Sequence, residues 1–438
     1  MSTYGTGLIT NPGTLIEDFE NSADWTLAGT GAALTADTTQ KTSGTQSLKL
    51  SGDTGNVIYM TKTVDLDLSA DGSFIIDVYS DVYDAERSFG IYFSSTTDFS
   101  KQFAAATILL GTRLVSTGHW SHIILSKADF TNTGAESWNN TMIRLKIRTW
   151  IGGGATQPFL WLDNLRAGYQ AKAVAIISFD DGYASVLSAG KPVLDTNGQY
   201  ATLFVTKATI GDAPTYLTEA ELATVYNAGW DIANHSYSHP VTLVGLDDAT
   251  LDDEVNDMFA YLYATLGFTR SAKFFCYPEG SYDDTVVTKV AENHRLARTV
   301  DDGQYKPHQS GVDDDYFYLG VYSLGAGVAA VEAVIDAVIA RNGVIHLYGH
   351  QVGAGGVSVA DLTTISDYLK ANETDISVMT FSEYFDAMGG GEGVLKRWNG
   401  AAWVKAKLLN RTSGAAWESR PISRWTGTGW TDVDGLGD

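Results

Sequence analysis

Two adjacent carboxylates, Asp180 and Asp181, follow an apolar run at residues 173–179 and precede a glycine. Taken alone, Asp-Asp-Gly after a strand is more typical of an ordinary turn, because Asp and Gly suit the backbone conformations of turns. The alternative interpretation is a place where a cation is held. Residues elsewhere in the chain decide between the two.

A pair of histidines, His235 and His239, follows another apolar run, and His350 follows a third. For an isolated pair, a solvated loop with two chance histidines is the more ordinary interpretation. The chain has only eight histidines, however, and three of them fall at predicted strand ends. Two imidazoles and one carboxylate can form a three-ligand site that leaves positions open on zinc or a similar ion. The sequence therefore predicts a metal site that needs only one of the two Asp residues, with the other free to act as general base.

The elements that must position these side chains are alternating strands and helices from about residue 170 onward. Strand-like runs lie at 173–179, 201–205, 230–234, 273–277, 297–300, 318–324, 344–348 and 376–380. Helical spacing of apolar residues covers 219–228, 251–266, 284–293, 328–340 and 359–371. This alternation indicates parallel strands with right-handed crossovers. It predicts a (β/α) barrel, complete or incomplete, whose functional groups sit at strand ends.

Residues 1–168 read instead as short strands of alternating apolar and polar residues, which predicts an antiparallel β-sandwich, and we expect a jelly roll. Examples lie at 47–50, 57–60, 74–79, 142–147 and 159–163. The stretches 16–21 and 160–165 resemble the first and last strands of jelly-roll carbohydrate-binding modules. Through that resemblance, Glu20 and Asp163 are candidate ligands of a structural calcium. The alternative is that both are solvated edge carboxylates, and no aromatic can be assigned to a glycan-binding face.

Four motifs in order along the chain resemble the polysaccharide deacetylase (NodB-homology) family, carbohydrate esterase family 4. They are Ser178-Phe179-Asp180-Asp181-Gly182, His235-Ser236-Tyr237-Ser238-His239, Pro278-Glu279-Gly280 and the late His350. The resemblance spans roughly residues 171–388. It implies a distorted (β/α) barrel that uses a divalent metal to remove acetyl groups from N- or O-acetylated glycans.

The resemblance also implies a role for each matching residue. Asp180 is the implied base and His350 the implied acid, which protonates the leaving group. Asp181, His235 and His239 are the implied ligands of the metal, with zinc expected first and cobalt or nickel as alternatives. The backbone amide near Glu279, with Tyr277 beside it, is the implied oxyanion and substrate contact.

Two departures from the family pattern stand out. An arginine that normally orients the base is replaced by Cys276, which we interpret as a small packed residue. The acidic motif that supports the catalytic histidine is not recognisable, and Arg298, Asp301 and Asp302 are the nearest candidates. His346 is predicted to be packed or hydrogen-bonded.

The domain organisation predicted is a sandwich at 1–168, the barrel at 169–388 and a tail at 389–438. After a glycine linker, the tail repeats an aromatic pattern with turn residues, at 398–403, 412–417 and 425–430, which predicts successive hairpins. Such repeats resemble the ends of phage and prophage tail proteins. They suggest a virion tail location, with other tail proteins as partners or a homo-oligomer such as a trimer.

Composition excludes several function classes. A formal net charge of −23 argues against nucleic acid as a partner. No apolar run is long enough to span a bilayer, no secretory signal is visible, and the single Cys276 excludes an internal disulfide. If not in a virion, the protein is expected in the cytoplasm until release. Two classes of function remain: a metal-dependent glycan deacetylase, and a glycan-binding or structural tail protein that has lost turnover.

Overall fold

The computed structural model describes residues 8–53, 55–80, 87–110, 120–150, 159–302, 306–307, 317 and 319–388, together with four short strands of the tail. Two antiparallel pairs are found in that tail. They place Trp398 opposite Trp403 and Trp425 opposite Trp430. The predicted repeat at 412–417 lies outside the described residues. The tail strands are β22 (Lys396–Trp398), β23 (Trp403–Lys405), β24 (Ser423–Trp425) and β25 (Trp430–Asp432).

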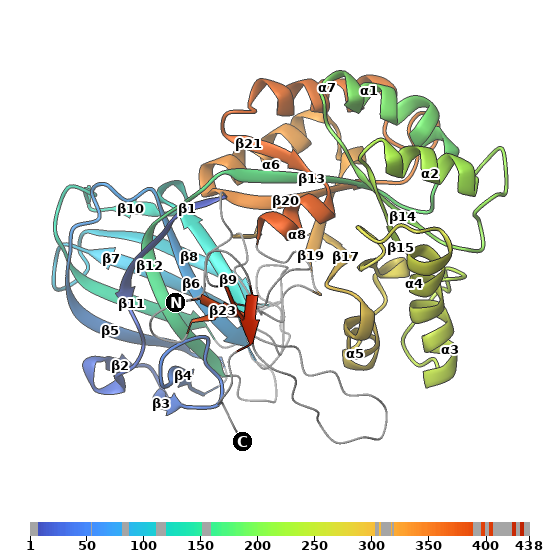
Figure 1. Cartoon of the computed structure of the whole chain (residues 1–438). Coiled ribbons are helices and arrows are strands. Elements are labelled where there is room, and N and C mark those ends of the chain that lie inside the picture. Colours follow the sequence, from blue (N-terminus) through green and yellow to red (C-terminus); the bar gives the residue numbers. More distant parts are fainter. Residues whose placement is uncertain are drawn as a thin grey trace.

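The N-terminal part forms two antiparallel sheets (Figure 1). One has the order β3-β4-β12-β6-β9 with β1 paired to β12, and the other has the order β10-β8-β7-β11-β5-β2. The first sheet contains β1 (Ile9–Glu17), β3 (Ala33–Asp37), β4 (Ser47–Ser51), β6 (Ser73–Ser80), β9 (Trp120–Ser126) and β12 (Leu160–Ala171). The second contains β2 (Thr26–Ala28), β5 (Val57–Leu66), β7 (Arg87–Ser94), β8 (Gln102–Leu110), β10 (Thr131–Thr133) and β11 (Met142–Trp150). Short 3₁₀ turns η1 (Ser22–Asp24) and η2 (Lys127–Asp129) lie between strands.

The alternating pattern of the strands builds one apolar core between these two sheets. Leu145 and Ile147 of β11 are fully buried in it, as are Ile58 and Met60 of β5. Successive side chains of a strand point to opposite faces, so the residues between them face away from the core. The predicted jelly-roll connectivity stays a prediction.

Seven parallel strands close into a barrel, in which the last strand, β20, pairs with the first, β13. The predicted (β/α) barrel is thereby confirmed. One further parallel strand, β21, pairs with the outside of the ring at β13, and the short β18 pairs antiparallel with β20. The strands are β13 (Ala173–Phe179), β14 (Thr202–Val205), β15 (Asp231–Asn234), β16 (Phe274–Cys276), β17 (Leu296–Asp302), β18 (Lys306–Pro307), β19 (Leu319–Ser323), β20 (Gly343–Gly349) and β21 (Ile376–Met379).

Helices cover the outside of the barrel (Figure 1). In α6 the residues Val331, Ile335 and Val338 are buried at helical spacing, which explains why this segment packs on the strands. The helices are α1 (Lys191–Thr196), α2 (Glu219–Asn227), α3 (Asp248–Asp252), α4 (Met258–Ala260), α5 (Asp284–Asn293), α6 (Val328–Arg341), α7 (Val359–Ala371) and α8 (Phe381–Ala387). Wider π-turns are η3 (Val186–Gly190), η4 (Asp253–Asp257) and η5 (Tyr261–Thr265), and further 3₁₀ turns are η6 (Pro278–Gly280) and η8 (Leu324–Ala326). The helix expected at 251–266 thus consists of four consecutive segments, α3, η4, α4 and η5.

A single residue, Lys172, separates the last sandwich strand from the first barrel strand. Its amide donates to the carbonyl of Leu8 at 2.9 Å, and the Leu8 side chain is buried in the same apolar cluster as Val174 and Ile176 of the barrel. A guanidinium of α6, Arg341, also donates to Asp129 of the sandwich. The two domains are therefore joined by continuous strands and by packing. Among the helices of the described residues, none has both the length and the apolar character that a membrane span requires.

Candidate metal and catalytic site

The two adjacent carboxylates of the Asp-Asp-Gly segment lie in different surroundings. Asp180 is 1% exposed, and its amide donates to the carbonyl of Gly349 at 2.9 Å, which ties the end of β13 to β20. Asp181 has a left-handed backbone with φ of 66°, and its side chain is 20% exposed. A left-handed residue turns the chain sharply, so the two neighbouring carboxylates can point to different places.

Both histidines of the predicted pair face Asp181. Its Oδ1 lies 3.6 Å from Nε2 of His235 and 3.5 Å from Nε2 of His239. These separations are too long for good hydrogen bonds. They match the roughly 3.4 Å expected between two ligand atoms that each lie about 2.0–2.1 Å from one tetrahedral zinc ion. The structure thus brings together the three predicted metal ligands in an arrangement that fits a divalent ion.

The protonation of His235 suits a ligand. Its Nδ1 lies 2.9 Å from the carbonyl of Cys276, which can only accept, so Nδ1 carries the proton and Nε2 keeps its lone pair. Burial lowers the pKa of His235, an effect only partly offset by Asp180. The neutral imidazole that binds metals is therefore the favoured form. A backbone carbonyl on the outer nitrogen is a common way to orient such a ligand.

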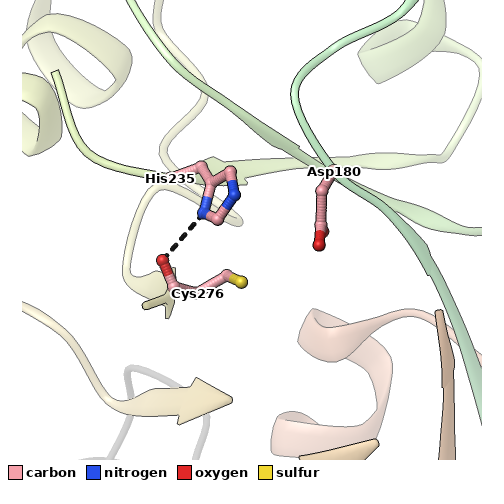
Figure 2. Close-up of side chains that lie close together, drawn as sticks. All are labelled: Asp180, His235 and Cys276. Carbon is pink, nitrogen blue, oxygen red and sulfur yellow. Dashed lines mark hydrogen bonds between the residues drawn. The ribbon is translucent and has the colours of Figure 1, made fainter. Parts of the chain in front are cut away.

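A second cluster of potential ligands shares His235 and includes Asp180 and Cys276 (Figure 2). It suits a metal less well. Burial raises the pKa of the Cys276 thiol well above its ordinary value, so the thiol stays protonated and is a poor ligand. Nδ1 of His235 is occupied by the Cys276 carbonyl, and the Asp180 carboxylate is held by an arginine. Cys276 is a packed strand residue, as its apolar surroundings suggested.

Arg298 is that arginine, and it comes from β17 rather than from the expected position on β16. Cys276 and Arg298 are opposite each other in the parallel pair of β16 and β17. The fully buried guanidinium donates to Asp180 and to the carbonyl of Thr299. Burial alone would raise the pKa of Asp180, but electrostatic attraction, led by Arg298, and the hydrogen bond from Arg298 outweigh burial and hold that pKa below its ordinary value. Asp180 is therefore ionised, as a general base must be.

The other predicted residues fall in different places. His350 is exposed after β20, with its ring 5.9 Å from that of Tyr348, and it is near enough to contribute to lowering the pKa of Asp180. Glu279 is exposed in η6 with a left-handed φ of 53°. Tyr277 is fully buried, and its amide already donates to the carbonyl of Arg298 at 3.1 Å. His346 is buried and lies 5.1 Å from the ring of Phe381. The backbones of Asp301 and Asp302 belong to β17, and their side chains lie outside the described residues.

One supporting residue was missed by the sequence reasoning. Glu254, buried in η4, accepts hydrogen bonds from the amide of Ser238 at 2.8 Å and from its hydroxyl. The Asn234 side chain accepts from the amide of Ser236 at 2.8 Å, and the Ser236 hydroxyl accepts from the amide of His239 at 3.0 Å. The segment that carries both histidines is thus fixed from two sides. Of the two serines between the histidines only Ser236 is buried, where a hydroxyl needs a partner, so the sequence carried no comparable signal for Glu254.

A pair of tyrosines borders the site. The ring of Tyr183, two residues after Asp181, stacks on Tyr216 with centroids 4.8 Å apart. A hydrogen bond with Tyr183, with burial and the nearby Asp181 adding to it, raises the pKa of Tyr216 to about 12. The Tyr216 phenol is therefore neutral and able to donate a hydrogen bond at ordinary pH.

The candidate calcium ligands of the sandwich hold a loop directly. Asp163 is buried and accepts from the amides of Thr42 and Ser43 at 2.9 and 3.1 Å. Glu20 accepts from the amide of Thr45 at 2.7 Å. Burial raises the pKa of Asp163 to about 6. A calcium role for these two residues stays a prediction.

Comparison with known sequences agrees with this geometry. Residues 167–298 match the model of the polysaccharide deacetylase family, a range that contains Asp180, Asp181, His235, His239 and Arg298. The match supports a polysaccharide deacetylase domain in this part of the chain. A Bacillus subtilis (strain 168) protein named "Putative polysaccharide deacetylase YxkH" is 29% identical over 130 residues, which is 29% of this chain and 45% of that protein. The chain thus spans less than half the length of this curated relative.

Solved structures with similar folds include carbohydrate esterases and a carbohydrate-binding module. The Bc1960 peptidoglycan N-acetylglucosamine deacetylase is 18% identical with a TM-score of 0.36, covering 49% of this chain and 89% of that one. A family 4 carbohydrate esterase from Streptomyces lividans is 20% identical with a TM-score of 0.32, covering 47% and 91%. A family 11 carbohydrate-binding module from Clostridium thermocellum is 14% identical with a TM-score of 0.28, covering 36% and 96%. At these scores none of the three establishes a shared function.

Proposed function

We propose that the chain is a metal-dependent deacetylase that removes N- or O-acetyl groups from a bacterial surface polysaccharide. The observation that carries the proposal is the different surroundings of two adjacent carboxylates. Asp180 is paired with Arg298, whereas Asp181 faces the Nε2 atoms of His235 and His239. One carboxylate is thereby suited to moving a proton and the other to holding a cation.

The residues divide the hydrolysis between them. A divalent metal, with zinc as the first candidate, would polarise the acetyl carbonyl and lower the pKa of a water at the site. Asp180 takes the proton from the attacking water, and Arg298 keeps this carboxylate ionised and oriented. The amide of Glu279 is assigned to the oxyanion, because the amide of Tyr277 is already bonded. His350 then gives a proton to the departing amine or alkoxide.

The test is acetate release from defined acetylated oligosaccharides and cell-surface glycans, after metal removal and reloading with zinc, cobalt or nickel. We expect acetate only with metal, and none from His235→Ala. Acetate released by His235→Ala at the wild-type rate would show the proposed metal site to be wrong. If a broad panel gave no acetate with any metal while the protein still bound cells, the enzyme proposal would fail.

The alternative of a binding or structural protein that has lost turnover rested mainly on the absent motif arginine. Arg298 occupies that role on the neighbouring strand, which removes the main support for this alternative.

We further propose that the protein is a component of a virion tail, in which it meets bacterial glycan from outside. The support is the repeated aromatic pattern of the tail, with two antiparallel strand pairs, beside a deacetylase domain. An oligomer such as a trimer is part of this proposal. Co-sedimentation of the protein with purified phage particles tests it. A wholly particle-free pool in infected or induced cells would contradict it.

A further inference from the structure

A buried histidine that the proposed catalysis does not use is hydrogen-bonded to the segment that carries the metal ligands. His294 follows the last residue of α5 and is fully buried. Its ring packs between two aromatic rings, with centroids 5.5 Å from that of Phe259 and 5.2 Å from that of Phe275. A polar ring in such an apolar place costs stability unless its nitrogens are hydrogen-bonded. The partners of those nitrogens therefore indicate what His294 does.

The hydrogen bonds of His294 determine which ring nitrogen carries the proton. Nδ1 lies 3.0 Å from the carbonyl of Val290, which can only accept a hydrogen bond. Burial lowers the pKa of His294 to about 3, so the ring is neutral and has a single N–H group, at Nδ1. Nε2 therefore keeps its lone pair and accepts a hydrogen bond from Nδ2 of Asn234 at 2.9 Å.

This acceptor fixes the orientation of the Asn234 amide, which is also fully buried. Nδ2 has two hydrogens, and the second is donated to the carbonyl of Val255 at 2.9 Å. A flipped amide would turn Oδ1 toward two acceptors, His294 and Val255, and would leave both without a donor. Oδ1 is thereby held toward the amide of Ser236, from which it accepts at 2.8 Å.

The loop that these hydrogen bonds reach has a strained backbone. Ser236 has a φ of 69° and the proposed ligand His239 a φ of 56°. Residues other than glycine rarely adopt this left-handed region, and they stay in it only when the surrounding structure holds them there. The Ser236 hydroxyl accepts from the amide of His239 at 3.0 Å. The series of hydrogen bonds from His294 through Asn234 thus ends on the backbone of a metal ligand.

We propose that His294 is a positioning residue, which holds the loop of residues 235–239 in the shape that directs the two imidazoles toward one metal ion. The inference rests on the proposed function for the presence of that metal. It assigns a role to a side chain from the end of α5, an element that supplies none of the proposed ligands. Because every bond in the series lies within the protein, the loop should keep this shape before a metal binds.

The first test is the zinc affinity of the full-length protein, measured by competition with a chelator. His294→Phe keeps a ring in the aromatic pocket but removes the acceptor. It should weaken zinc binding by about 10- to 100-fold, as changes to groups that orient ligands do. His294→Gln presents a carbonyl oxygen to Asn234 in place of Nε2 and an amide donor to Val290, so it should recover most of the affinity.

A second readout needs no metal. Hydrogen exchange in the peptide that covers residues 235–240 should be faster in metal-free His294→Phe than in the metal-free wild type, because the loop is held less firmly. The matched control is Ser366→Ala, which removes a buried hydrogen bond to Gln199 at a place that the metal site does not use. It should lower the unfolding temperature and leave both zinc affinity and this exchange unchanged.

Several outcomes would overturn the proposal. They are wild-type zinc affinity in folded His294→Phe, equally weak binding by folded His294→Gln, or an equal loss of affinity in Ser366→Ala. Thermal unfolding shows whether each variant is folded. If His294→Phe does not fold, Ser236→Ala removes only the hydroxyl at the end of the series, and unchanged zinc affinity in that variant would also contradict the proposal.

Acetate release is measured separately, so that the two proposals can fail independently. Zinc binding that depends on His294, without acetate release by the wild type, would refute the proposed catalysis and leave this positioning role standing. Acetate release by the wild type, with unchanged zinc affinity in His294→Phe, would refute the positioning role alone.

Discussion

Carboxylates at the barrel mouth and carboxylates in the sandwich look alike in the sequence but are satisfied differently. Asp163 accepts hydrogen bonds from two backbone amides of one loop, so it anchors that loop through hydrogen bonds of the chain itself. Oδ1 of Asp181 faces two imidazole nitrogens at 3.5 and 3.6 Å, and at least one of them presents a lone pair. A carboxylate surrounded by hydrogen-bond donors holds the chain together, whereas one surrounded by acceptors calls for a cation.

The largest expected effect is on metal binding and acetate release, when the Asp181 carboxylate is removed and the Asp163 carboxylate is removed for comparison. Asp181→Ala should abolish stoichiometric zinc binding and lower acetate release by about 10³-fold or more, because several kcal/mol of charge stabilisation are lost. Asp163→Ala should leave zinc stoichiometry unchanged and lower the unfolding temperature. Elemental analysis and calorimetry measure both. Zinc retained by Asp181→Ala at one ion per chain would contradict the comparison.

The next effect concerns the arginine that was expected on another strand. Arg298→Met leaves the buried Asp180 without its partner, which should destabilise the barrel by about 3–5 kcal/mol. The pKa of Asp180 should rise, so that the acidic limb of the kcat/KM profile moves to higher pH, since the base then becomes protonated over a wider acidic range.

A double variant, Arg298→Met with Cys276→Arg, distinguishes loss of the charge near Asp180 from loss of packing. It places the guanidinium on β16, the strand paired with β17, at the position that the family pattern predicts. We expect this double variant to move the acidic limb back toward the wild-type pH. An unchanged acidic limb in Arg298→Met itself would show that Asp180 does not depend on this partner.

A smaller effect on metal affinity is expected from Glu254, which bonds Ser238 beside the proposed ligand His239. Glu254→Gln keeps the shape of the side chain but weakens its bonds to Ser238, so the His239 segment is held less firmly. Changes to groups that orient ligands typically cost about 10- to 100-fold in metal affinity. Competition with a zinc chelator measures this. Glu373→Gln is the control, because Glu373 pairs with Lys370 on the surface.

The smallest effect is a pH dependence within the sandwich. The pKa of Asp163 is raised to about 6 in the folded chain, so the folded state holds a proton that the unfolded state has already lost near pH 5. The stability of the wild type relative to Asp163→Asn should therefore fall as pH rises from about 4 to 6, by on the order of 1–2 kcal/mol. Chemical unfolding at several pH values, with chelator present, measures the difference. A difference that grows with pH would indicate that an ion holds Asp163 ionised.

The sequence was sufficient for those parts of the site that depend on one segment at a time. Apolar runs of strand length between helical patterns predicted the barrel, and the spacing of His235 and His239 after one of them predicted the ligands. Arg298 could not be placed, because its partnership with Asp180 depends on β16 and β17 being neighbours in register. The role of Glu254 could not be predicted for a related reason. It directly follows Asp252 and Asp253, and of these three acidic residues only Glu254 is buried. The π-turn that starts at Asp253 shifts which side of the helix faces inward.

The direct connection of β12 to β13 through Lys172 determines whether the barrel could be produced without the sandwich. Leu8, which precedes the first sandwich strand, is buried in the same apolar cluster as Val174 and Ile176 of the barrel. Strand β1 pairs with β12 as far as Ala171. A barrel cut free at residue 169 would lose that apolar contact and keep an unpaired stub of β12. The sandwich thus stabilises the barrel through direct contacts, and a functional transfer of the barrel to another protein would require moving both domains together.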